Sequence, residues 1–170
     1  VEALVDITHI DGLSAIQQDG DTLTIGAGTT HTQIVQSPLI AARATCLVES
    51  CGVVGGPQVR NVGTLGGNVA HALPAGDGTT SLVALDAEAE IVKDGQRRWV
   101  PIGEMYVGPG QSLLDPCADL LVQVRFRLCG AREATAFKRI MRPQGVALPV
   151  LGCAAWLRLD AAGECCEDVR

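Results

Sequence analysis

Aromatic and basic side chains are scarce in this sequence. Aromatic residues make up 3% of the 170 residues, and 13 Lys and Arg stand against 19 Asp and Glu, for a formal net charge of −6. A nucleic-acid-binding domain needs a basic face, and a membrane-spanning helix needs an apolar run of about 18 residues or more. Neither pattern occurs, and no signal-peptide pattern opens the sequence. We therefore expect a cytoplasmic protein with no nucleic-acid partner and no membrane span.

Metal-binding patterns are also missing. The seven cysteines include no Cys-x-x-Cys pair, which leaves a zinc ribbon or an iron–sulfur loop without support. The three histidines, His9, His31 and His71, lack metal-ligand spacing, and we expect each on the surface or in a loop. We expect reduced, mostly buried thiols, while the vicinal pair Cys165 and Cys166 leaves a redox role open. The sequence therefore predicts no metal site.

What the sequence does contain is a mixture of short strands, turns and helices. With 47% apolar residues, the chain is long enough to bury a core, as one ordinary domain or as a domain plus part of another. Asp-Gly pairs at 19–20 and 94–95 are tight-turn signals, and Thr30 has the character of a helix N-cap. The expected strands cover 3–10, 16–18, 22–25, 87–92, 98–101, 120–128, 136–140 and 153–159, and the expected helices cover 32–36, 38–49 and 79–85. This mixture predicts an α+β fold.

Glycine is especially dense in residues 52–70. Each glycine destabilises a helix by about 1 kcal/mol relative to alanine, so we expect turns here. Within this stretch Gly66 and Gly67 present consecutive backbone N–H groups, a pattern typical of phosphate binding. Thr64 adds a hydroxyl donor, and Asn68 can donate or fix the loop. A purely structural turn is the alternative interpretation.

Another glycine loop, residues 24–31, follows a strand and precedes a helix. A dinucleotide-binding fingerprint has that placement, but His31 stands in place of its third glycine. No acidic residue ends a following strand about 20 residues on, as the fingerprint also requires. We therefore expect these glycines to let the strand turn. Farther along, Asp77 can accept hydrogen bonds from sugar or ribityl hydroxyls.

Six stretches, in the same order, resemble the flavin domain of the molybdenum hydroxylases, the xanthine dehydrogenase, carbon monoxide dehydrogenase and aldehyde oxidase family. They are Gly26–His31, Val59–Ala70, Pro74–Asp77, Leu82–Ala87, Leu120–Phe126 and Phe137–Arg139. The resemblance implies an α+β fold, the second subdomain of a PCMH-type (vanillyl-alcohol oxidase-like) FAD-binding domain, followed by the start of an α+β C-terminal domain. The expected ranges are 1–130 and 131–170.

The resemblance also implies the cofactor, FAD, and the residues that hold it. The segment Thr64, Leu65, Gly66, Gly67 and Asn68 would bind the pyrophosphate, Asp77 the ribityl chain, Leu121 would pack near the flavin ring, and Lys138 would lie beside the polar parts of the cofactor. Leu121 as plain core and Lys138 as a solvated charge are the alternatives. No residue is implied as a catalytic acid, base or nucleophile.

In the family, electrons pass from iron–sulfur clusters through FAD to NAD, a quinone or oxygen. The implied partners are a 2Fe-2S small subunit and a molybdopterin large subunit, or equivalent domains of one chain. The first residue is Val1 rather than Met, and we expect a fragment lacking both ends, including an earlier Ala-Gly-Gly-Thr-type loop. FAD binding by these residues alone is then expected to be poor. The alternatives are a self-contained FAD oxidoreductase of the same broad fold and a non-enzymatic interaction domain with structural glycine loops.

Overall fold

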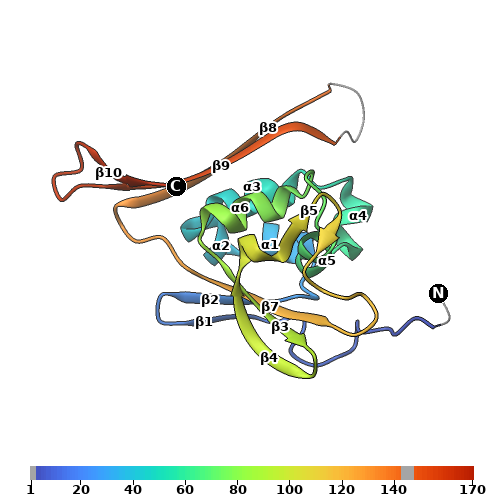
Figure 1. Ribbon diagram of the computed structural model, residues 1–170. Coiled ribbons are helices and arrows are strands. Elements are labelled where there is room, and N and C mark those ends of the chain that lie inside the picture. The colour runs from blue at the N-terminus through green and yellow to red at the C-terminus, as the bar shows by residue number, and fades with distance from the viewer. Residues whose placement is uncertain (1–2, 143–147) are drawn as a thin grey trace.

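The computed structural model describes residues 3–142 and 148–170, in which a layer of helices lies between two antiparallel sheets (Figure 1). The first sheet has five strands in the order β1-β2-β7-β3-β4, and the second has three in the order β10-β9-β8. The strands are β1 Ile16–Asp19, β2 Thr22–Gly26, β3 Glu88–Lys93, β4 Gln96–Pro101, β5 Tyr106–Gly108, β6 Gln111–Ser112, β7 Leu120–Arg127, β8 Glu133–Met141, β9 Pro149–Leu159 and β10 Cys166–Val169. The helices are α1 His31–Val35, α2 Pro38–Arg43, α3 Thr45–Gly52, α4 Pro57–Val62, α5 Leu65–Ala70, α6 Asp77–Ala84 and the 3₁₀ helix η1 Ile102–Met105.

Two hairpins and one distant strand build the five-stranded sheet. Both predicted Asp-Gly turns are confirmed: they join β1 to β2 and β3 to β4, with positive φ at Gly20, Asp94 and Gly95. The late strand β7 then enters between the two hairpins and pairs with β2 and β3. All these pairings are antiparallel, so the described strands contain no βαβ nucleotide-binding unit.

The helices cover one face of this sheet and bury its apolar side chains. Alternate residues of β2 and β3, among them Leu23, Ile25 and Ile91, are fully buried against the helices. The N-cap prediction for α1 is confirmed, because Thr30 and Gln33 form a reciprocal capping box. The single helix predicted over 38–49 is wrong, because Ala44, at φ −155° and ψ 52°, divides it into α2 and α3.

Two other expectations about local structure are wrong. Residues 3–10 form no strand; Leu4 and Val5 are 91% and 83% exposed, and no described strand pairs with them. The glycine-dense stretch contains helices α4 and α5, with Gly66 and Gly67 inside α5. A helix forms there because the Thr64 hydroxyl caps its first turn, and packing rather than propensity sets the conformation.

The three-stranded sheet follows β7 and packs on α3 and α6 from the opposite side (Figure 1). The expected boundary at residue 130 lies in the connection between β7 and β8, and the division into domains remains a prediction. All seven cysteines are free; Cys46, Cys51 and Cys129 are buried and the other four are exposed, so the expectation of mostly buried thiols is wrong. Across residues 3–142 and 148–170, no helix is long and apolar enough to cross a membrane.

Candidate functional site

A cavity of about 870 Å³ opens beside the start of α5. It lies where the β2–α1 loop, helices α4 and α5, and the chain leading into β7 meet. Four of the predicted site residues line it, namely Thr64, Gly66, Gly67 and Leu121. The structure therefore brings together the glycine segment and a residue more than fifty positions away in the sequence.

The backbone N–H groups at the start of α5 are bonded within the protein. Leu65 N donates to Thr29 O at 2.9 Å, Gly66 N to Ala27 O at 2.9 Å, Gly67 N to Thr64 Oγ1 at 3.0 Å and Asn68 N to Thr64 O at 3.0 Å. The two glycine N–H groups are thus not the open donors that the sequence suggested. The Thr64 hydroxyl accepts the hydrogen bond from Gly67 N, and its own hydrogen is still available to donate, because a hydroxyl is both acceptor and donor.

The adjacent glycines Gly66 and Gly67 serve different purposes. A Cβ on Gly66 would lie 2.5 Å from the Cβ and carbonyl oxygen of Ala27, so this glycine lets α5 approach the β2–α1 loop. A Cβ on Gly67 would meet only the Thr64 hydroxyl, at 3.2 Å, within 4 Å. Gly67 is exposed and lines the cavity. Gly66 is therefore required by packing, whereas Gly67 leaves room for a close approach by a ligand.

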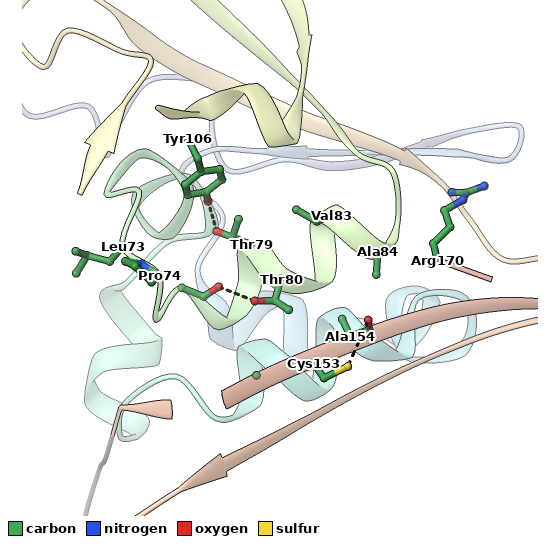
Figure 2. Close-up of a pocket in the computed structure, with 12 residues that line it drawn as sticks. Leu73, Pro74, Thr79, Thr80, Val83, Ala84, Tyr106, Cys153, Ala154 and Arg170 are labelled. Atoms are coloured by element: carbon green, nitrogen blue, oxygen red, sulfur yellow. Dashed lines mark hydrogen bonds between the residues drawn. The ribbon is translucent and has the colours of Figure 1, made fainter. Parts of the chain in front are cut away.

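The remaining two residues of the segment, Leu65 and Asn68, support it from behind. Leu65 is 1% exposed and belongs to the core. The Asn68 Oδ1 accepts from the backbone N and the hydroxyl of Thr79, at 3.3 and 3.4 Å. The Tyr106 hydroxyl in turn donates to the Thr79 hydroxyl at 2.5 Å, as the dashed line in Figure 2 shows. Asn68 thereby fixes α5 to α6 rather than facing the cavity.

Leu121 is both core and cavity wall. It is 5% exposed and lies on β7 beside an irregularity in the pairing with β3, where the partner of Glu90 is Gln123 and that of Ile91 is Leu121. The irregularity lets β7 present Leu121 to the helices and the cavity. The two interpretations of Leu121 made from the sequence, a plain core residue and a residue packed near the flavin ring, are therefore compatible.

Asp77 and Lys138 lie outside this cavity. Asp77 begins α6, is 4% exposed, and its Oδ2 accepts a hydrogen bond from Arg139 Nη1 at 2.6 Å. Burial raises the pKa of Asp77, and the Arg139 charge partly opposes that shift. Lys138 points the other way on β8; its side chain is 84% exposed and pairs with Glu49 at 3.2 Å.

A second cavity of about 490 Å³ lies between α6, Tyr106 and β9 (Figure 2). Its walls are largely apolar, with Leu73, Val83 and Ala154 among the lining residues. None of the predicted cofactor residues lines it. It shares Thr79 with the hydrogen-bond chain that reaches Asn68.

The prediction that His31 lies on the surface or in a loop is wrong, because it is the first residue of α1. It is 2% exposed, not a surface residue, and its backbone N donates to Gly63 O just before α5. Burial and the nearby Arg60 charge lower the pKa of His31 to about 4. Its burial at the first residue of a capped helix, with the imidazole beside Gly63, follows from tertiary packing. Among the described residues, no group of His, Cys, Asp or Glu side chains is arranged to hold a metal ion.

A cavity of about 870 Å³ beside a capped glycine-containing helix, in an α+β fold, has the size of a small-molecule or cofactor site. Residues 1–126 match the family model described as the FAD binding domain in molybdopterin dehydrogenase. That match covers well over half of the chain. The chain therefore belongs to this family of FAD-binding domains, as its motifs predicted, and the fold class is confirmed.

Individual relatives agree with this assignment. The chain is 32% identical over 157 residues to the carbon monoxide dehydrogenase medium chain of Hydrogenophaga pseudoflava, covering 92% of this chain and 54% of the relative. It is 34% identical over 161 residues to the putative xanthine dehydrogenase FAD-binding subunit of Escherichia coli, with 92% and 54% covered. A solved carbon monoxide dehydrogenase from H. pseudoflava matches with a TM-score of 0.89 at 29% identity, over 97% of this chain and 56% of that one. The chain thus spans about half the length of these relatives.

Proposed function

We propose that the 870 Å³ cavity binds FAD, with the Thr64 hydroxyl and the open surface at Gly67 receiving the pyrophosphate. The observation that carries this proposal is that Thr64, Gly67 and Leu121 line the same cavity in a chain of this family. The volume suits a cofactor, since ligand sites usually measure about 300–1,000 Å³. Gly66, Leu65 and Asn68 hold the segment in place from the protein side.

We propose that Leu121, which lines the cavity, lies at the flavin end of the cofactor, and we extend this proposal to Asp77 and Lys138, which lie outside the cavity. Asp77 supports this with an unused acceptor: among the described residues its Oδ1 is buried without a hydrogen-bond partner. Buried polar atoms are nearly always bonded, and a cofactor hydroxyl becomes the partner of Oδ1 only where the packing of α6 against β9 opens. Leu121 supplies an apolar wall, and the exposed ammonium of Lys138 supplies a positive charge on β8.

The proposed activity is electron transfer through FAD within a molybdopterin-dependent dehydrogenase. When bound, FAD supplies the redox chemistry, accepting electrons from iron–sulfur clusters and passing them to NAD, a quinone or oxygen. The protein binds and orients the cofactor and excludes water from it. The proposed partners are a 2Fe-2S small subunit and a molybdopterin large subunit, by analogy with relatives named as medium chains and FAD subunits. The family match favours this function over a self-contained flavoprotein or a purely structural domain.

The proposed location is the cytoplasm. The seven free thiols support it, because cysteines stay reduced there and pair in oxidising compartments.

The decisive test is the flavin content of the full-length protein and of a Gly67→Asp variant. The new carboxylate would occupy the space at the Thr64 hydroxyl and repel a pyrophosphate, so we expect yellow parent protein and a variant without flavin. Gly103→Asp is the matched control, because Gly103 is exposed on η1 and a Cβ there meets nothing within 4 Å. Normal flavin loading of Gly67→Asp would contradict the assigned pyrophosphate site.

A further inference from the structure

Two side-chain amides face the 870 Å³ cavity while their oxygens are bonded to the protein. Gln33 on α1 and Asn61 on α4 are both exposed, and both line the cavity to which FAD is assigned. The Oε1 of Gln33 accepts hydrogen bonds from the backbone N and the hydroxyl of Thr30, at 2.8 and 3.1 Å. The Oδ1 of Asn61 accepts a hydrogen bond from the Thr32 hydroxyl at 2.6 Å. These bonds fix the orientation of each amide.

The amide nitrogens of both side chains are left to the cavity. A side-chain amide nitrogen carries two N–H donors, and across residues 3–142 and 148–170 neither Gln33 Nε2 nor Asn61 Nδ2 donates to another protein group. The oxygen of Gln33 is identified by its partner Thr30 N, because a backbone N–H can only donate. The two amides therefore offer donors, and a ligand that meets them has to supply acceptor atoms.

Backbone pairing brings these donors close to the Thr64 hydroxyl. Thr30 and Thr64 form an isolated antiparallel bridge, so the start of α1 lies against the start of α5. Gln33 is bonded to Thr30, and Asn61 lies near the end of α4, three positions before Thr64. The two amides and the hydroxyl, three neutral groups that can each donate a hydrogen bond, therefore line one cavity together with the open surface at Gly67.

Positive charge is scarce on the same walls. Among the described residues that line the cavity there is no Lys or Arg, and the ionisable ones are Asp119 and His71. The side chain of Asp119 is 1% exposed and pairs with Lys93 Nζ at 2.5 Å, so its charge is balanced within the protein. An anion in this cavity is therefore bound mainly through hydrogen bonds from neutral groups. The pyrophosphate of a dinucleotide suits such walls, because it has several acceptor oxygens and only a single negative charge on each phosphate.

We propose that Gln33 and Asn61 are further binding residues for FAD, and that their amide N–H groups donate to the pyrophosphate beside the Thr64 hydroxyl. This inference rests on the proposed function, in which the 870 Å³ cavity binds FAD. Bonds to the protein hold both amides in a donating orientation before the cofactor arrives. Helices α1 and α4 thereby join the segment Thr64–Asn68 in forming the pyrophosphate site.

The variant Gln33→Glu separates cofactor binding from structural support. Glu still accepts from Thr30 N, since Glu and Gln both complete a capping box, but it puts a carboxylate oxygen in place of the amide nitrogen. Asn61→Asp likewise keeps the acceptor for the Thr32 hydroxyl. FAD would be titrated into full-length apo-protein of the parent and of both variants. We expect each variant to bind FAD about ten- to a hundredfold more weakly, because it loses a hydrogen bond to a charged group, while the Tm of the apo-protein stays level.

Salt distinguishes a contact with the pyrophosphate from a contact with a neutral part of the cofactor. Salt screens the repulsion between the new carboxylate and a pyrophosphate, so the loss of affinity in Gln33→Glu should be smaller at about 1 M than at about 0.05 M NaCl. Gln36→Glu is the matched control, because Gln36 is exposed at the C-terminal end of α1 and does not line the cavity. We expect this control to bind FAD like the parent at both salt concentrations.

Parent affinity in Gln33→Glu or in Asn61→Asp would refute the role of that residue, and if one variant does not fold, the other decides. A loss that salt leaves unchanged, or that Gln36→Glu shares, would overturn the pyrophosphate contact. Failure of the proposed function is a different outcome: if the parent binds no FAD, or Gly67→Asp loads normally, the cofactor site itself is wrong. If the parent binds FAD and Gly67→Asp does not, parent affinity in both amide variants refutes the role of the amides alone.

Discussion

The two adjacent glycines of α5 should respond in opposite ways to the same substitution. In Gly66→Ala the new Cβ would be placed 2.5 Å from the Cβ and carbonyl oxygen of Ala27, well inside the usual carbon contact of about 3.5–4.0 Å. The obstacle is backbone, so α5 has to move away from the β2–α1 loop. That movement also strains the hydrogen bond from Gly66 N to Ala27 O, which is 2.9 Å long in the unsubstituted protein.

The expected magnitudes follow from this geometry. Overpacking in a well-packed region destabilises by about 1–3 kcal/mol, and a domain of this size loses roughly 2–4 °C of Tm per kcal/mol. Gly66→Ala should therefore lower Tm by roughly 2–12 °C. Gly67→Ala faces open space apart from the Thr64 hydroxyl, and alanine stabilises a helix interior by up to about 1 kcal/mol. Its Tm should stay level or rise.

Gly67→Ala should lower FAD affinity, although it leaves the Tm level or raises it. The methyl group of Gly67→Ala projects where the cofactor is proposed to approach, so we expect affinity to fall by about tenfold or more, equivalent to roughly 1.4 kcal/mol. Thermal unfolding of the apo-protein and FAD titration of the folded protein measure the two effects separately. Equal Tm values for the two variants would refute the close-approach argument, and full FAD affinity in Gly67→Ala would refute the pyrophosphate assignment.

Three further predictions concern single side chains. Thr64→Val removes the N-cap of α5 and should destabilise by about 0.5–2 kcal/mol in chemical unfolding, while Thr64→Ser, as the control, keeps both stability and flavin. Asp77→Ala should weaken FAD binding by roughly ten- to a hundredfold in titrations and, by leaving Arg139 buried without its counter-charge, reduce stability by about 3–5 kcal/mol; an unchanged Kd would rule out direct contact. Because the pKa of His31 is lowered to about 4 in the fold, the unfolded chain binds the proton first on acidification, so stability should fall from about pH 6.5 toward pH 4 by at most about 1.4 kcal/mol per pH unit. His31→Gln should flatten that slope in urea unfolding at several pH values, and an equal slope in both proteins would exclude His31 as its source.

Structural features that depend on residues adjacent in the sequence were predictable. The Asp-Gly turns fixed both hairpins, since their residues tolerate positive φ. Thr30 predicted the start of α1, where it forms the capping box with Gln33. The cofactor segment itself was found because its residues are contiguous, from Thr64 to Asn68.

What depended on distant contacts was not predictable. Position 66 has to be glycine because Ala27 lies against it, and nothing local to Gly66 encodes that neighbour. Arg139 is paired with Asp77 only because the sheet that contains β8 and β9 packs over α3 and α6. The burial of His31 has the same origin. Propensity and motif spacing describe a residue's own segment, whereas these features belong to pairs of segments that meet only in the folded protein.

The position of β7 has a consequence for how the chain folds. Its residues pair with β2 across about a hundred positions, as in Thr22 with Arg127, and with β3 on the other side. During synthesis the two hairpins emerge first, with the edges of β2 and β3 that β7 later covers still unpaired, and no continuous sheet exists until Leu120–Arg127 leaves the ribosome. Contacts between distant segments slow folding, and exposed strand edges invite association between chains. The interval before β7 arrives is therefore the period in which this protein most needs protection from aggregation.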